Sequence, residues 1–140
     1  MTPRTVLLVD DDARVRDAVR VALEMNGLTV LDAADAMAAL AIVSSARRSI
    51  DLLLTDVNMP GIDGVELARR VRLLRPEIRV RYMSGSDPHE LATRGLSCVR
   101  GELLTKPFGV DVLMERVCQA LGGPDRSGSF GRRASVGRSA

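Results

Sequence analysis

Short apolar runs alternate with segments of helical periodicity through the first 121 residues of this 140-residue chain. Five runs have the length and composition of strands: residues 6–9, 28–31, 52–54, 78–83 and 103–104. The first four are rich in Val, Ile or Leu, which is typical of strands buried on both faces of a parallel sheet. Because parallel strands need crossover connections, the alternation predicts an α/β fold of (βα)5 type, a five-stranded parallel sheet covered by helices on both faces.

The segments between these runs are predicted to be helices. Apolar stripes run through residues 15–23, 65–74 and 110–121, residues 36–43 are helical by composition, and residues 87–96 have the least regular pattern. Asn26-Gly27 predicts a left-handed cap at the end of the first helix, and Pro76 ends the third. We expect the Met and Leu positions of these helices to lie in the core.

Polar residues follow four of the strand-like runs. They are Asp10, Asp11 and Asp12 after the first, Asp56 after the third, Ser84 after the fourth and Lys106 after the fifth. Lys106 is the only lysine among the twenty basic residues. Since ligands of open parallel sheets bind beyond the carboxyl ends of the strands, these side chains are predicted to form one site.

The carboxylates of this site predict a hard divalent cation. Three of them at neighbouring strand ends would repel one another without a cation between them. Mg²⁺ prefers oxygen ligands and keeps several waters, so two or three protein oxygens suffice. A carboxylate oxygen could then accept a phosphoryl group whose charge the metal and an ammonium neutralise. Asp56 stands alone after its run and is the better nucleophile, whereas Asp10 and Asp11 suit the ion.

Four motifs carry a family resemblance, in order and at the expected spacing. They are Val9-Asp10-Asp11, the segment 54–64 around Asp56, Met83-Ser84-Gly85, and the segment 104–108 around Lys106. Together they resemble the receiver domain of bacterial two-component response regulators over about residues 4–121. The resemblance implies a flavodoxin-like, doubly wound sheet with strand order 2-1-3-4-5, the order of the chemotaxis receiver.

The same resemblance implies roles for the site residues. Asp56 would be the phosphoacceptor and, with Asp11 and the Asn58 backbone carbonyl, would ligate Mg²⁺ directly, while Asp10 would act through a coordinated water. Ser84 would hydrogen-bond the phosphoryl oxygens and Lys106 would pair with the same group, beside a cis peptide to Pro107. The implied partners are a sensor histidine kinase or a histidine phosphotransfer protein, and a downstream protein. We expect a monomer or weak dimer.

One residue departs from the family pattern. Leu103 stands three residues before Lys106, where family members usually carry Tyr or Phe, so the usual aromatic readout of activation is not expected here. Asn58 and Ser86 occupy positions that resemble those tuning the lifetime of the phosphoaspartate.

Other interpretations remain open for these residues. Asp10 to Asp12 alone could begin a helix, with Asp12 as its cap, and residues 56–61 alone could be a turn. A phosphatase of the haloacid dehalogenase type would use Asp10-x-Asp12, but would expect Thr or Val at Ala13 and a longer chain. A phosphorylation-independent interaction module with a receiver-like fold is the second alternative.

Composition limits the remaining possibilities. At 140 residues the chain has room for one domain, predicted as a receiver over 1–121 with a disordered Gly/Ser/Arg-rich tail over 122–140. A net charge of +2 and three aromatic residues favour neither nucleic-acid binding nor direct contact with DNA. The longest apolar run, residues 36–43, is too short to span a bilayer. Isolated Cys98 and Cys118 indicate reduced thiols in the cytoplasm, with Cys118 a core residue.

Overall fold

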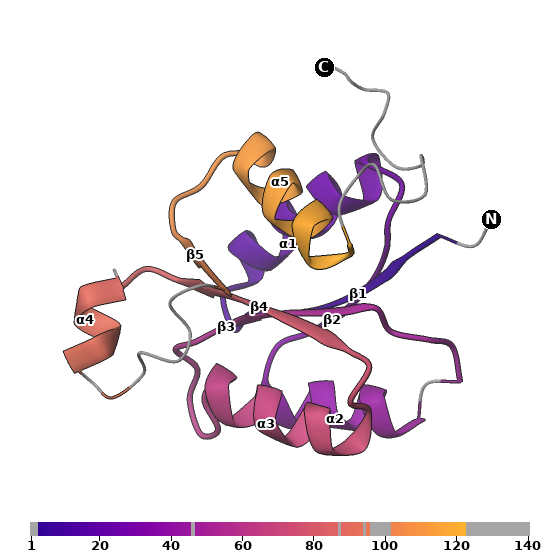
Figure 1. The fold of residues 1–140 in the computed structure, drawn as a ribbon, viewed down its shortest axis with the longest axis horizontal. Helices are drawn as coiled ribbons and strands as arrows, with labels where there is room; N and C mark the ends of the chain where they lie inside the picture. Colours follow the sequence, from indigo (N-terminus) through magenta and orange to yellow (C-terminus); the bar gives the residue numbers. More distant parts are fainter. Residues whose placement is uncertain (1–2, 46, 87, 94, 96–101, 123–140) are drawn as a thin grey trace.

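The computed structural model describes residues 3–45, 47–86, 88–93, 95 and 102–122, and contains a parallel five-stranded sheet. Its strands are β1 (Thr5–Val9), β2 (Thr29–Ala33), β3 (Leu52–Asp56), β4 (Arg79–Ser84) and β5 (Leu103–Thr105). They lie in the order β2-β1-β3-β4-β5, all paired in parallel (Figure 1). The predicted α/β class and strand order are therefore confirmed.

Helices cover both faces of this sheet. They are α1 (Ala13–Met25), α2 (Ala36–Ser45), α3 (Gly64–Leu74), α4 (Pro88–Thr93) and α5 (Val110–Ala120). Figure 1 shows α1 and α5 on one face and α2 and α3 on the other, while α4 lies at the end of the sheet toward which the strands run. Asp12 caps α1 by accepting hydrogen bonds from two backbone N–H groups, and Gly27 after its end has a φ of 87°. Both predicted ends of this helix are confirmed.

The core has two layers because successive strand residues point to opposite faces. Val6, Leu8, Leu52, Leu54, Met83 and Leu104 pack on the α1 and α5 side. Leu7, Val9, Leu53, Val80, Tyr82 and Leu103 pack on the α2 and α3 side. Residues of β1 and β3 are fully buried in both layers. This double burial explains why the central strands read as continuous apolar runs in the sequence.

The strands extend further than the apolar runs predict. β3 and β4 continue through Asp56 and Ser84, and β2 continues to Ala33. In the ladder Asp56 is paired with Met83, and Ser84 with Thr105. Main-chain pairing carries the strands past the last aliphatic residue, and hydropathy does not report main-chain pairing. The site residues Asp56 and Ser84 therefore belong to the sheet itself and not to the loops.

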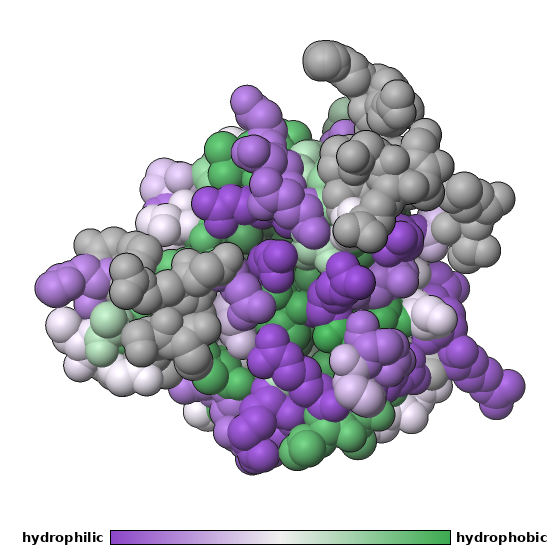
Figure 2. All heavy atoms as spheres, in the orientation of Figure 1, coloured by the Kyte–Doolittle hydropathy of each residue, from purple (hydrophilic) through white to green (hydrophobic). Residues whose placement is uncertain are grey.

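The expectation that every Met and Leu of the helices lies in the core was wrong. Met25 is 80% exposed, Leu73 is 73% exposed and Met37 is 64% exposed. Each helix packs on the sheet through one narrow stripe, so apolar residues beside that stripe face the solvent. Figure 2 shows small hydrophobic areas among the hydrophilic residues on the face of the molecule that it presents. Cys118 is only half-buried. Cys98 and residues 123–140 of the predicted tail lie outside the described residues.

Gly64 brings the start of α3 against the end of β3. Its N–H donates to the Val57 carbonyl at 2.9 Å, and a Cβ added at this position would overlap the carbonyl oxygen of Asp56. A glycine is therefore required here by close approach of two backbones. The contact ties the loop after Asp56 to the strand that presents the Asp56 side chain.

We predict that Gly64→Ala lowers the free energy of unfolding by about 1–3 kcal/mol, because the new methyl group must displace backbone. Urea denaturation measures the loss. Gly85→Ala is the matched control, since a Cβ at Gly85 meets no atom within 4 Å. Equal stability of the Gly64 and Gly85 variants would contradict the packing argument.

Candidate functional site

Three carboxylates converge at the carboxyl ends of β1 and β3. Asp10 and Asp11 follow β1, and Asp56 is the last residue of β3. One carboxylate oxygen from each residue lies within 4.8 Å of the others. Asp10 is fully buried and Asp56 is 6% exposed, whereas Asp11 is exposed to solvent. Since β1 and β3 are adjacent in the sheet, the strand order places these groups together.

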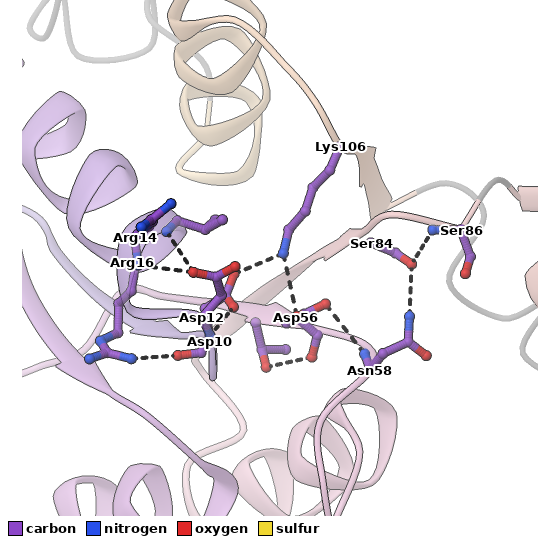
Figure 3. Close-up of polar contacts among 11 residues, drawn as sticks. Asp10, Asp12, Arg14, Arg16, Asp56, Asn58, Ser84, Ser86 and Lys106 are labelled. Carbon is purple, nitrogen blue, oxygen red and sulfur yellow. Dashed lines mark hydrogen bonds and ion pairs between the residues drawn. The ribbon is translucent and has the colours of Figure 1, made fainter.

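Lys106 joins the carboxylates from the edge of the sheet. Its Nζ donates to Asp10 Oδ2 at 2.9 Å and to Asp56 Oδ2 at 3.4 Å (Figure 3). The Lys106 backbone N–H donates to the Ser84 carbonyl at 2.7 Å, which fixes the residue beside β4. The peptide bond between Lys106 and Pro107 is cis, as predicted. The only lysine of the chain thus bridges two buried carboxylates.

The ionisation of Asp56 reflects opposing influences. Burial raises the pKa of Asp56 above its ordinary value, and the negative charge of Asp10 adds to that rise. Lys106 and the Asn58 N–H oppose this rise without cancelling it. The pKa of Lys106 is raised although burial alone would lower it, because a hydrogen bond to Asp10 and the charge of Asp56 favour the ammonium form. The ammonium is therefore the stable form of Lys106 in this site.

Ser84 and Asn58 form a second polar group next to Asp56. The Asn58 backbone N–H donates to Asp56 Oδ1 at 3.3 Å, and Asn58 Nδ2 donates to Ser84 Oγ at 3.2 Å. The Ser86 N–H also donates to Ser84 Oγ, at 3.0 Å (Figure 3). Ser84 is fully buried, and within the described part of the chain its hydroxyl proton has no acceptor. The hydroxyl is held as an acceptor of two bonds, with its proton free to donate.

Asp12 and Arg16 position the site without belonging to the acidic cluster. Asp12 Oδ1 accepts from the Arg14 and Val15 N–H groups at 2.9 and 3.3 Å, so its carboxylate caps α1. Arg16 Nη1 donates to the Asp10 carbonyl at 2.7 Å, and its Nε donates to Asp32 Oδ2 at 3.2 Å. Arg16 was not predicted from the sequence, because a charged residue on the first turn of a helix ordinarily indicates only a solvated face.

Leu103 occupies an apolar position. It is 4% exposed and packs in the layer under α2 and α3, where it is paired with Tyr82 of β4. Its carbonyl accepts a hydrogen bond from Arg116 Nη1 at 2.9 Å. The side chain has no polar end to present to solvent or to a partner, which agrees with the expectation from the sequence.

Comparison with known proteins decides the family. The model of the response regulator receiver domain matches residues 6–118. This chain belongs to the receiver domain family. Its relatives include the phosphate regulon transcriptional regulatory protein PhoB of Pseudomonas aeruginosa, 34% identical over 123 residues, and the response regulator MprA of Mycobacterium ulcerans, 35% identical over 112 residues. These alignments cover 86% and 80% of this chain but 53% and 47% of the relatives. The chain therefore spans about half the length of the curated relatives it matches.

Solved structures agree with this assignment. The chemotaxis protein CheY4 of Vibrio cholerae superimposes with a TM-score of 0.75 at 30% identity, covering 86% of this chain and 100% of that one. The receiver domain of the hybrid histidine kinase CckA gives a TM-score of 0.69 at 36% identity, with coverage of 84% and 98%. Receiver domains are phosphoaccepting signalling domains that generally bind Mg²⁺ at an acidic cluster, here Asp10, Asp11 and Asp56. Across the described residues, no helix combines the length and apolar character needed to cross a membrane.

We predict that the Asp56 carboxyl lowers the stability of the metal-free receiver as pH rises. Because its pKa is raised on folding, the unfolded chain loses this proton at a lower pH than the folded protein does. The free energy of unfolding, measured with urea and a chelator, should fall from about pH 4 upward relative to Asp56→Asn. In a Lys106→Met background the fall should be larger, since the opposing cation is gone. A difference that grows in favour of the wild type as pH rises would contradict the assigned direction.

Proposed function

We propose that this receiver is a single-domain response regulator, in residues 1–121, that accepts a phosphoryl group on Asp56 in a Mg²⁺-dependent reaction. The protein would act in the cytoplasm, and the donor would be a phosphohistidine of a sensor histidine kinase or a histidine phosphotransfer protein. The signal would leave by altered binding to another protein or by phosphorelay, with no direct contact to DNA. The observation that carries the proposal is the Lys106 ammonium between two buried carboxylates, beside an exposed third.

The transfer step follows from the groups around Asp56. A bond forms between an Asp56 carboxylate oxygen and phosphorus, while the phosphorus–nitrogen bond of the donor breaks and its imidazole leaves with the electron pair. Asp56 must be ionised to attack, and Lys106 favours that form. Lys106 then neutralises charge on the transferred oxygens, and Ser84 supplies a hydroxyl donor. Positioning and charge stabilisation account for the catalysis, with no separate general base.

The carboxylate set suits a magnesium ion. Asp11 is exposed, and among the described residues its carboxylate has no hydrogen-bond or ion-pair partner, so its oxygens are available as ligands. Asp56 and the Asn58 carbonyl complete the direct ligand set that we propose, and Asp10 acts through a coordinated water. When bound, the ion neutralises negative charge that accumulates between donor and acceptor oxygens.

Phosphorylation would change the charge beside the fourth and fifth strands. Phosphorylated Asp56 would carry about −1.5 to −2 charges near neutral pH, in place of the single negative charge of its carboxylate. Ser84 is the last residue of β4 and Lys106 immediately follows β5, so these two adjacent strands would respond to the new anion. We propose that the face formed by α4, β5 and α5 reports the change, without an aromatic switch at Leu103. The protein would act as a monomer or weak dimer.

A phosphorylation-independent interaction module is the second candidate function. The buried Leu103 favours it, because the side chain that usually reports activation is missing. The intact set of Asp10, Asp11, Asp56 and Lys106 favours the phosphoacceptor. Labelling distinguishes the two.

We predict a gain of one phosphoryl group in intact-mass spectrometry when the full chain is incubated with Mg²⁺ and acetyl phosphate. Asp56→Asn and a chelator should each abolish the gain, because one removes the acceptor and the other removes the cation. Asp12→Asn is the matched carboxylate control and should still be labelled, since Asp12 caps α1. A folded, metal-loaded protein that gains no phosphoryl group would favour the interaction module. Continuous release of phosphate from esters would instead favour a phosphatase.

We predict that Asp11→Asn weakens Mg²⁺ binding by roughly tenfold or more. Mutating a residue that only supports a metal ligand typically lowers metal affinity by about 10- to 100-fold, and loss of a ligand should lower it at least as much. Titration calorimetry measures the affinity. Asp12→Asn removes the same charge from the neighbouring position and keeps a favourable helix cap. The Mg²⁺ affinity of this variant should therefore stay within about twofold of the wild-type affinity. Equal losses in the two variants would mean that general charge, and not ligation by Asp11, determines binding.

A further inference from the structure

A charged cavity lies at the opposite end of the sheet from Asp56. Its volume is about 740 Å³, and three segments line it: the start of β1, the start of β2 and the connection between α2 and β3. At about 3.3 Å per strand residue, the five residue steps from Thr5 to Asp10 separate the two sites by roughly 16 Å along the chain direction of β1. The cavity is therefore distinct from the phosphoacceptor site.

Three arginines give this cavity a positive charge. Arg4, Arg47 and Arg48 line it and are exposed, and within the described part of the chain none of them forms an ion pair with a carboxylate. Asp51 is the one acidic residue of the lining, and its Oδ2 accepts a hydrogen bond from the Thr5 N–H at 2.8 Å. The charged lining side chains therefore carry a net charge of +2.

Main-chain hydrogen bonds hold the walls of the cavity in place. The Thr29 N–H donates to the Arg4 carbonyl and the Asp51 N–H donates to the Thr5 carbonyl, each at 2.9 Å. Arg75 Nη1 donates to the Arg48 carbonyl at 3.1 Å, which anchors the connection after α2 to the residue that follows α3. The arginines thus extend from backbone that the sheet and Arg75 fix.

We propose that this cavity binds an oligophosphate group, either free or as part of a nucleotide. Guanidinium forks match phosphate oxygens in geometry and charge, and an excess of two positive charges suits a ligand with at least two negative ones. Thr29 and Ser49 line the same cavity, and each carries a hydroxyl group that is a further potential donor. The volume lies within the range of small-molecule sites, about 300–1,000 Å³. This second ligand site needs neither Asp56 nor a metal ion.

Titration calorimetry of the full chain tests the proposal, with tripolyphosphate and ATP as probes and a chelator present. We expect saturable binding of one ligand per chain. Arg4→Gln with Arg48→Gln should weaken it at least tenfold. Arg14→Gln with Arg69→Gln removes the same charge from exposed arginines outside the cavity, and should change the affinity by less than twofold. Asp56→Asn should bind as the wild type does, which separates this site from the phosphoacceptor.

The two probes identify the source of the phosphates. Equal affinities would assign the cavity to the phosphate chain alone, and tenfold tighter binding of ATP would assign it to a nucleotide. Absence of saturable binding, equal losses in the two double variants, or loss in Asp56→Asn would overturn the proposal. Tighter binding of duplex DNA that depends on Arg4 and Arg48 would also overturn it, in favour of a nucleic-acid contact.

Discussion

The bridge from Lys106 to Asp10 and Asp56 is the interaction on which the site depends. Parallel pairing of β1 with β3 forces carboxylates from two strand ends into a buried space, where unpaired charges are costly. The cation that offsets this repulsion comes from the far side of the sheet, after β5. The ion pair therefore links the first, third and fifth strands along one edge. The strand order therefore brings together both the two buried carboxylates and the ammonium group that offsets their charge.

The bridge also sets the chemical character of Asp56. Burial favours the protonated carboxyl, whereas Lys106 favours the carboxylate, and the pKa of Asp56 stays raised. The Asp56 carboxylate is therefore largely removed from solvent, and Lys106 offsets only part of the effect of that burial. Asp11 differs because it is exposed and keeps its oxygens for other ligands. Neighbouring aspartates thus have different roles, and the Asp12 carboxylate caps α1.

Much of this arrangement could be predicted from the sequence. The apolar runs identified all five strands, and the polar residues at their ends identified the cluster of Asp10, Asp11, Asp56 and Lys106. The strand order did not follow from periodicity and came from family resemblance. Arg16 was missed because a charged residue in the first turn of a helix ordinarily indicates only a solvated face. Met25 and Leu73 were misplaced because hydropathy does not show how narrow the stripe is through which a helix packs on the sheet. Strand ends depend on main-chain pairing with neighbouring strands, and burial depends on packing against other elements. Local hydropathy patterns report neither.

The hydrogen bonds around Ser84 fix more than its position. A hydroxyl has one proton and two lone pairs, and here Asn58 and the Ser86 N–H each donate to its oxygen. With both acceptor directions taken, rotation about the Cβ–Oγ bond is restricted, and the proton is left the remaining direction. An anion that takes this proton need displace neither existing bond. The orientational entropy of the hydroxyl has been lost during folding, so recruiting it later costs less than ordering a freely rotating serine.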